Sequence, residues 1–241
     1  MRTLRWIVLT AAVGFVTVGC NGKLSDNGGT GTAPPDTAPS PITSISAPVA
    51  GFTGSADAGF EARDPNHDVL LATGTLVASA SRFDAEFLPL ADVPAIALEP
   101  GPPELGVDQG DLVCDVSVVP STVRATGAFM FSHVDGSGRL ALSTFDFFSS
   151  YYGAAAFTVN SRFYVFLLAD RAGRIQGTCD DPDSGVTIEY AVDLVEGWNP
   201  VAFALTSVDA DGDPVSWRIQ DERPTPQASW FYFGIDFDIP D

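Results

Sequence analysis

The chain has 241 residues and carries 31 acidic against 12 basic side chains, which gives a formal net charge of -19 at pH 7. A polyanion of this kind repels nucleic acid and anionic lipid head groups, so the composition argues against direct DNA or RNA binding. The hydrophobic fraction of 45%, with 17 Phe residues, excludes disorder over most of the length and predicts a sizeable core. We interpret the acidity as a solvated surface in preference to a specific cation-binding role.

The first segment has the order of a secretory leader. Arg2 and Arg5 precede an apolar run from Trp6 to Val18, and a small residue, Gly19, closes it. The run is too short for an ordinary membrane-spanning helix of about 20 residues. Residues 1–19 are therefore predicted to be a signal peptide, and everything after them an exported protein.

Gly19-Cys20 at the cleavage point resembles the lipobox of bacterial lipoproteins, in which the Cys becomes the acylated first residue of the mature protein. Thr17 stands three positions before the Cys, where that family usually has Leu. The resemblance implies that lipid on Cys20 attaches the chain to the bacterial cell membrane or outer envelope, facing the extracytoplasmic side. The alternatives are a cleaved leader followed by an ordinary Cys, or an uncleaved anchor.

Assigning Cys20 to the lipid leaves Cys114 and Cys179, which allow a single intramolecular pairing. An oxidising compartment favours that pairing, so we predict a structural disulfide between them. The alternative is a pair of free buried thiols. The sequence around each Cys lacks the neighbouring base that an activated nucleophile needs.

Residues 20–46 are rich in Gly, Ser, Thr, Pro and Asp and contain almost no large apolar side chain. Such a segment buries too little surface to offset the entropy of ordering it, so it is predicted to be a flexible tether. A Pro-rich break at Glu99-Pro100-Gly101-Pro102-Pro103 divides the rest into residues 47–100 and 101–241. The smaller piece is near the size limit for independent folding, which favours two β units packed together over two free domains.

Beyond the tether, short β-rich runs alternate with Asp, Gly and Ser turns, as at residues 135–138 and 180–185. This pattern predicts an all-β protein, an antiparallel β-sandwich of a small and a larger unit. Ile188 to Leu194 alternates with period two and predicts a strand with one buried face. Phe163 to Leu168 is apolar on both faces and predicts a central strand. Gly197-Trp198-Asn199-Pro200 is predicted to be a turn plugged by its aromatic ring.

Two further resemblances concern the folded part. Leu71 to Phe87 resembles the edge hairpin of carboxypeptidase-regulatory-like β-sandwich modules, although Ala80-Ser81 replaces their Asp-Gly turn. That resemblance implies no functional residue. The segments 169–171, 177–179 and 194–201 are together similar to a group of uncharacterised bacterial envelope lipoproteins, which implies the same cellular address and no known activity.

Asp209, Asp211 and Asp213 occupy alternate positions around Gly212, where carboxylate oxygens could converge on Ca²⁺. The segment resembles the Asp-x-Asp-Gly-Asp turns of bacterial cadherin-like repeats. It departs from an EF-hand loop because no Glu lies seven residues beyond Asp213 and because predicted strands flank it. The alternative is an ordinary hairpin turn, in which Asp and Gly are the usual residues.

The segment from Trp230 to Asp238 alternates strictly, and its Phe and Ile residues are predicted to face the core. Trp230 and Tyr232 would then share the opposite, exposed face with Asp236 and Asp238. Flat aromatic rings beside carboxylates are suited to stacking on sugar rings and bonding their hydroxyls, so these four residues are a candidate carbohydrate-binding surface. The alternative is that a loop or a second sheet covers that face and makes the rings ordinary packing.

Catalysis finds little support in the sequence. Only two His are present, His67 in Asp64-Pro65-Asn66-His67-Asp68 and His133 beside a predicted turn. A His next to an Asp in a loop is commonly a solvated turn residue, and a metal site at His67 would need a further ligand that the sequence does not identify. The sequence contains none of the common catalytic motifs and no zinc-spaced Cys cluster.

We therefore predict a lipid-anchored, extracytoplasmic, non-enzymatic module that binds a cell-envelope glycan or protein, or that has a structural role in the envelope. The alternatives are a secreted glycan-active hydrolase that uses a carboxylate pair, and a purely structural spacer with an acidic surface. An exposed aromatic platform or a concave acidic pocket would favour binding. Complete coverage of Trp230 and Tyr232 would favour the spacer.

Overall fold

The computed structural model describes residues 41–64, 66–100, 112–146, 157–182 and 184–234. The predicted leader, Cys20 and most of the expected tether lie outside the described residues, as do Asp236 and Asp238. Within these ranges the chain is all-β, as predicted, and its helical segments are three short 3₁₀ turns, Ala78–Ala80, Leu90–Asp92 and Ala95–Ala97. The same ranges contain no helix with the length and apolar character of a membrane span.

The strands of the described residues are β1 (Ser44–Ala50), β2 (Ala58–Arg63), β3 (Leu70–Val77), β4 (Arg82–Phe87), β5 (Glu99–Pro100), β6 (Val113–Val119), β7 (Arg124–Ala128), β8 (Phe131–His133), β9 (Gly138–Ser143), β10 (Arg162–Ala169), β11 (Gly173–Asp180), β12 (Thr187–Leu194), β13 (Gly197–Val208), β14 (Pro214–Asp221) and β15 (Ser229–Gly234).

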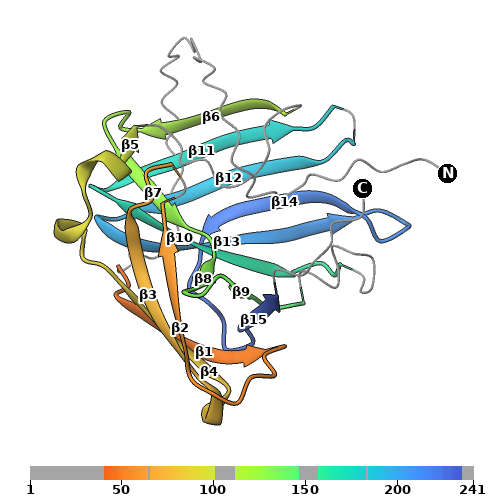
Figure 1. The fold of residues 1–241 in the computed structure, drawn as a ribbon. Helices are drawn as coiled ribbons and strands as arrows, with labels where there is room; N and C mark the ends of the chain where they lie inside the picture. The colour runs from red at the N-terminus through yellow and green to blue at the C-terminus, as the bar shows by residue number, and fades with distance from the viewer. Residues whose placement is uncertain (1–40, 65, 101–111, 147–156, 183, 235–241) are drawn as a thin grey trace.

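Seven of these strands close into a barrel, in the order β15-β1-β4-β3-β2-β8-β9, with β9 pairing back to β15. Neighbours in the barrel are antiparallel except β1 and β15, which run parallel with Val49 opposite Trp230. The first and last described strands therefore lie side by side and form the seam of the barrel. Figure 1 shows the barrel below a larger sheet.

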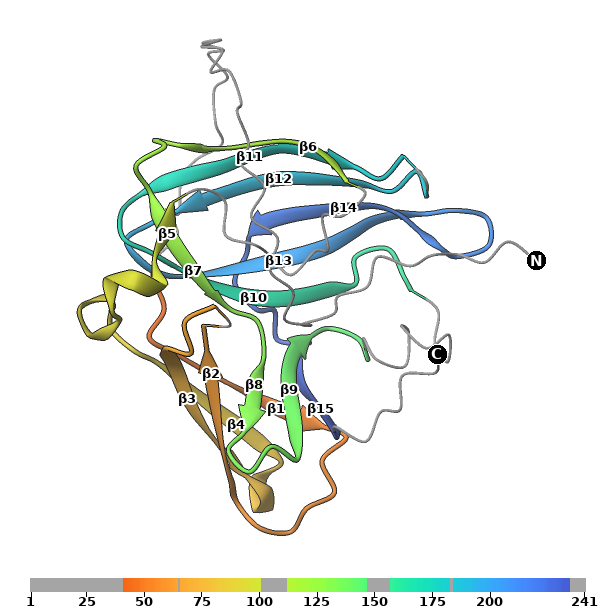
Figure 2. The same ribbon diagram turned by 45° about the horizontal axis from the view of Figure 1, so that its top comes forward.

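That larger sheet is curved and has the order β10-β13-β14-β12-β11-β6. Its neighbours are antiparallel except β12 and β14. The other side of β10 is shared, because β9 pairs with Phe163 and Tyr164 while β7 pairs with Phe166 to Ala169. β10 thus joins the sheet to the barrel, and β6 forms the opposite edge of the sheet (Figure 2).

β10 holds this position because its sequence is apolar on both faces, as predicted. Its even-numbered residues from Tyr164 to Leu168 belong to the core that fills the barrel. Its odd-numbered residues from Phe163 to Ala169 belong to a second core on the other face of the strand. The alternation predicted for Ile188 to Leu194 is also confirmed, because β12 turns those residues into the second core.

Aromatic rings fill the barrel. The rings of Phe83 and Phe131 meet Trp230 edge-on, with centroids 4.9 and 5.3 Å from the indole, and Phe60 meets Phe83 at 5.4 Å. The Trp230 side chain is 0% exposed. Each edge-to-face contact between aromatic rings contributes about 0.5–1.5 kcal/mol beyond the stabilisation from burying the rings. The interior of the barrel is therefore a packed core.

The facing predicted for the last strand is wrong. Phe231 and Phe233 are partly exposed, whereas Trp230 points into the barrel and Tyr232 packs against the same core. β15 has apolar side chains on both faces because the opposite face also meets a core, where Phe233 packs. Alternation alone does not identify the inner face of such a strand.

The turn predicted at residues 197–200 is also wrong, since β13 already begins at Gly197. The Asn199 side chain explains the difference, because it holds the end of the preceding strand. Its Oδ1 accepts the amide of Val195 at 2.8 Å, and its Nδ2 donates to the Val195 carbonyl at 2.9 Å and to that of Gly197 at 2.7 Å. The ring of Trp198 is buried, as expected.

The boundaries expected from composition do not coincide with divisions in the fold. β1 begins at Ser44, inside the range expected for the tether. β8, β9 and β15 follow residue 100 in the sequence, yet they complete the barrel that β1 to β4 begin. The hairpin expected at residues 71–87 is present as β3 and β4, with Ser81 at φ 47° in its turn.

Candidate functional site

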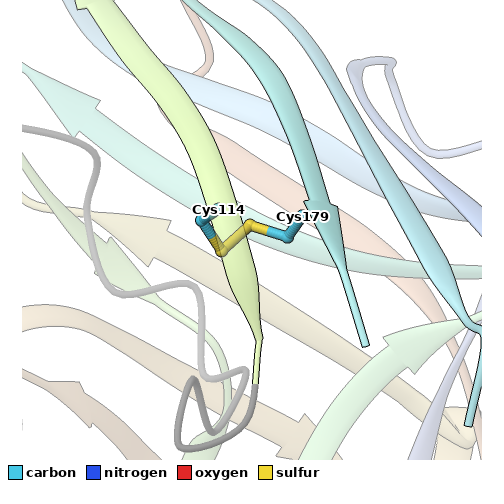
Figure 3. The surroundings of a disulfide bond; sticks show 2 residues. All are labelled: Cys114 and Cys179. Carbon is cyan, nitrogen blue, oxygen red and sulfur yellow. A yellow bond between two sulfur atoms is a disulfide. The ribbon is translucent and has the colours of Figure 1, made fainter. Parts of the chain in front are cut away.

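Cys114 on β6 and Cys179 on β11 form the predicted disulfide (Figure 3). The two residues are direct neighbours across antiparallel strands, and their Cα atoms lie 4.0 Å apart. Cys179 is 1% exposed and belongs to the second core, whereas Cys114 lies at the surface. The bond fastens the edge strand to the sheet, which is a structural role.

Asp209, Asp211 and Asp213 lie in the hairpin between β13 and β14. Asp209 Oδ1 accepts hydrogen bonds from the amides of Asp211 and Asp213, both at 2.9 Å. Gly212, at φ +88°, supplies the left-handed residue of the turn. These are the contacts of the hairpin-turn alternative. In the described part of the chain, no three His, Cys, Asp or Glu side chains are grouped to hold a metal ion.

Trp230 and Tyr232 do not form the exposed aromatic platform that the sequence suggested. The indole of Trp230 is enclosed by the barrel, and the Tyr232 ring covers Gly138, where a Cβ atom would lie 2.4 Å from the Tyr232 hydroxyl. That hydroxyl is 3.4 Å from the carbonyl oxygen of Ser137, to which it donates. The prediction that Trp230 and Tyr232 belong to a carbohydrate-binding surface is therefore wrong, because both rings pack in the barrel.

A different cluster, at the hairpin between β2 and β3, brings together side chains that can do chemistry. Asp64 directly follows β2 and is 4% exposed. Its Oδ1 accepts the amides of Asn66 and His67 at 3.1 and 2.7 Å, and His67 Nδ1 at 3.0 Å. Its Oδ2 accepts the hydroxyl of Thr126 on β7 at 2.8 Å. Four hydrogen bonds to both oxygens offset the cost of burying this carboxylate.

These bonds also fix the direction of the His67 ring. A neutral ring that donates from Nδ1 to the Asp64 carboxylate has its acceptor at Nε2. Nε2 lies 3.9 Å from Oε1 of Glu99 on β5, and the His67 and Glu99 side chains are 25% and 52% exposed. Glu99 pairs with Ala125, the neighbour of Thr126 on β7. β7 thus positions both Glu99, through its pairing with β5, and Asp64, through Thr126.

Next to this hairpin, a depression of about 310 Å³ opens on the outer wall of the barrel. The Arg63 Nε donates to Glu61 Oε2 at 2.9 Å, and its Nη1 donates to the carbonyl of Asp68 at 3.0 Å. The hydrogen bond to Glu61 raises the pKa of Arg63, so the guanidinium stays charged. The depression is lined by polar and apolar residues from β2 and the β8 region: Glu61, Arg63, Met130, Ser132, His133, Val134 and Gly136.

His133, which also lines the depression, is fixed on two sides. Its ring meets Phe60 edge-on with centroids 4.9 Å apart, and its Nδ1 accepts the amide of Asp135 at 3.2 Å and contacts the Asp135 carboxylate. Hydrogen bonds from Ser137 are the main cause that lowers the pKa of Asp135, which keeps that carboxylate ionised. Both His residues of the chain therefore have a carboxylate beside Nδ1.

The sequence places Asp64 and His67 in a loop and favours a solvated turn residue for His67. It gives no role in a site to Glu99, Thr126 and Arg63. Glu99 and Thr126 lie beside the hairpin because β5 pairs with β7 and β7 lies against the hairpin. A contact between segments so distant in the sequence cannot be predicted from a local pattern. One signal was available for the pair itself. An Asp three residues before a His in a turn has its carboxylate within reach of the His amide and ring.

Comparison of the chain with protein-family models, with curated proteins and with solved structures finds no match in any of the three. The function is therefore inferred from the chain's own residues.

Proposed function

We propose that the protein is a lipid-anchored, extracytoplasmic, non-enzymatic binding module whose ligand site is the depression on the outer wall of the barrel. One observation carries the proposal: an ion pair, a hydroxyl and two apolar side chains surround a concave surface of about 310 Å³. Binding sites for small molecules commonly combine apolar walls with a few convergent polar groups. The volume suits a single sugar ring or one side chain of a protein partner.

The position of the site follows from how the barrel is filled. Its interior is occupied by its own rings, with Phe83 and Trp230 both 0% exposed, so a ligand is expected on the outer wall. There, Arg63 has more N–H donors than its bonds to Glu61 and Asp68 use. The remaining donors suit a sugar hydroxyl or a carboxylate of an envelope glycan or protein.

The anchoring part of the proposal rests on the first 20 residues. Arg2, Arg5 and the apolar run to Val18 support export, and Gly19-Cys20 supports acylation of Cys20. The disulfide between Cys114 and Cys179 supports the same address, because such bonds persist in oxidising compartments. We also propose that the curved sheet and the barrel are the two packed units of the predicted antiparallel sandwich.

A structural spacer is the second candidate function, and the burial of Trp230 favours it. That burial removes the aromatic platform that would have argued for binding at β15. A hydrolase receives less support. Glycoside hydrolysis requires two carboxyl groups about 5 to 9.5 Å apart, and Glu61 is the one carboxylate among the described residues that line the depression.

A glycan and cell-wall binding screen of the full chain tests the binding proposal. The matched pair of variants is Arg63→Ala and Arg171→Ala, because both side chains are exposed and each pairs with a nearby carboxylate. Binding that is weakened in the Arg63 variant and retained in the Arg171 variant would support the site. Binding that is equal in both, or absent from the wild type, would favour the spacer.

The anchor is tested by Cys20→Ala. The variant is expected to lose acylation and to appear in the soluble fraction, while the wild-type chain sediments with membranes and incorporates labelled palmitate. Membrane retention of the variant through acylation at another residue would contradict the lipid-anchor proposal.

A further inference from the structure

We propose that His67 and Glu99 bind a divalent transition-metal ion, for which Zn²⁺ is the probe. The proposal starts from the geometry of the hairpin cluster. His67 Nε2 faces a Glu99 carboxylate oxygen at 3.9 Å, while Nδ1 of the same ring lies 3.0 Å from the Asp64 carboxylate. An imidazole nitrogen and a carboxylate oxygen at this separation can bind one cation between them.

The separation of the two donor atoms is close to what a metal ion requires. Zn²⁺ binds His nitrogen and carboxylate oxygen at about 2.0–2.2 Å, so two such ligands at a tetrahedral angle lie about 3.4 Å apart. Glu99 would have to move by about half an ångström to reach that separation from 3.9 Å. Its side chain is 52% exposed, so a rotation suffices, and its backbone stays paired opposite Ala125.

The groups around the pair are those that support a metal-bound His. A ligating His commonly donates its second ring N–H to a carboxylate, which fixes the ring and raises its basicity. Asp64 has this role and is itself fixed by Thr126. Imidazole with carboxylate suits Zn²⁺ and its first-row neighbours, whereas Ca²⁺ takes oxygen ligands. With two protein ligands, water completes the coordination.

Charge in the neighbourhood also favours a cation. The carboxylates of Glu61, Asp64, Asp68 and Glu99 surround the hairpin, and Arg63 is the positive side chain in contact with them among the described residues. Arg63 is bonded to Glu61 and Asp68, away from the His67 ring. The inference is independent of the proposed ligand site, because neither His67 nor Glu99 lines the depression.

Calorimetric titration of the metal-free, full-length chain with Zn²⁺ tests the proposal. We expect one ion per chain, with affinity weakened at least about tenfold in His67→Ala and in Glu99→Gln, and about 10–100-fold in Asp64→Asn. Glu99→Gln is the decisive variant, because the side chain is exposed and nearly isosteric and so leaves folding intact. His133→Ala is the matched control, since that His also lies beside a carboxylate.

A second readout follows the His67 ring by NMR, where Zn²⁺ should shift the signals of that imidazole and leave those of His133 in place. Equal affinity in the wild type and in Glu99→Gln would overturn the proposal. So would the absence of binding to the wild type at millimolar Zn²⁺. Loss of metal binding would leave the glycan result for Arg63→Ala unchanged, so the two proposals fail separately.

Discussion

Removing both cysteines of the disulfide, with Cys114→Ala and Cys179→Ala together, should lower the free energy of unfolding by about 4 kcal/mol. The figure comes from the 65-residue separation of the two residues, which sets the chain entropy that the bond removes from the unfolded state. For a folded unit of this size, a loss of 1 kcal/mol lowers Tm by about 2–4 °C, so the expected fall is roughly 8–16 °C.

The assay is urea unfolding followed by tryptophan fluorescence, with the wild type measured both oxidised and reduced. Trp198 and Trp230 are buried and report on the barrel core, whereas Trp217 reports on the second core. The reduced wild type should match the double variant. Cys20→Ala is the control for the loss of a Cys outside the bond and should leave the unfolding curve unchanged.

Two results would refute the reasoning. A loss of less than about 1 kcal/mol in the double variant would mean that the bond does not constrain the unfolded chain as the entropy model requires. Reactive thiols at both positions in the untreated, denatured wild type would mean that the bond does not form. The second result would also withdraw the disulfide as support for an oxidising compartment.

Three further predictions concern the packing. Gly177→Ala should lower the free energy of unfolding by at least about 3 kcal/mol, because φ is +135° and a Cβ would lie 1.9 Å from the backbone of β6. Gly136 has φ +81° and open space around it, so Gly136→Ala should lower the free energy of unfolding by only about 1–2 kcal/mol. Trp230→Ala should lower the free energy of unfolding, measured in urea, by about 3–5 kcal/mol, and Phe231→Ala should lower it clearly less. The reverse order would mean that Phe231 faces the core, as the sequence predicted. Burial raises the pKa of Tyr190 to about 12, above its unfolded value near 10, so its contribution to stability is complete below pH 10 and is lost by about pH 12. Tyr190→Phe should flatten that alkaline loss, and an unchanged pH profile would contradict the assignment.

Where a strand has one apolar face, or is apolar throughout, its place in the fold could be predicted. Ile188 to Leu194 faces one core, and its alternation with period two predicted one buried face. Phe163 to Leu168 faces two cores, and its continuous apolar run predicted a central strand. β15 is the case in between. Its two faces meet two different cores, and the choice between Trp230 and Phe231 depends on which rings the other barrel strands supply.

The candidate site was predictable only in its local half. Asp64 and His67 are three residues apart, so turn geometry alone brings them together. Glu99 and Thr126 join them because β5 and the β2–β3 hairpin both lie against β7, which is a matter of topology. For the same reason, composition placed a unit boundary at residue 100, although the barrel takes strands from both sides of it.

The parallel pairing of β1 with β15 has a consequence for how the chain is made. Until β15 arrives, β1 and β9 each present an unpaired edge, and the barrel lacks the indole of Trp230 at its centre. Nearly the whole described length must therefore be synthesised before the first strand has both of its neighbours, and contacts of such range form slowly. A chain cut short before β15 is therefore expected to remain an open sheet that is prone to aggregation.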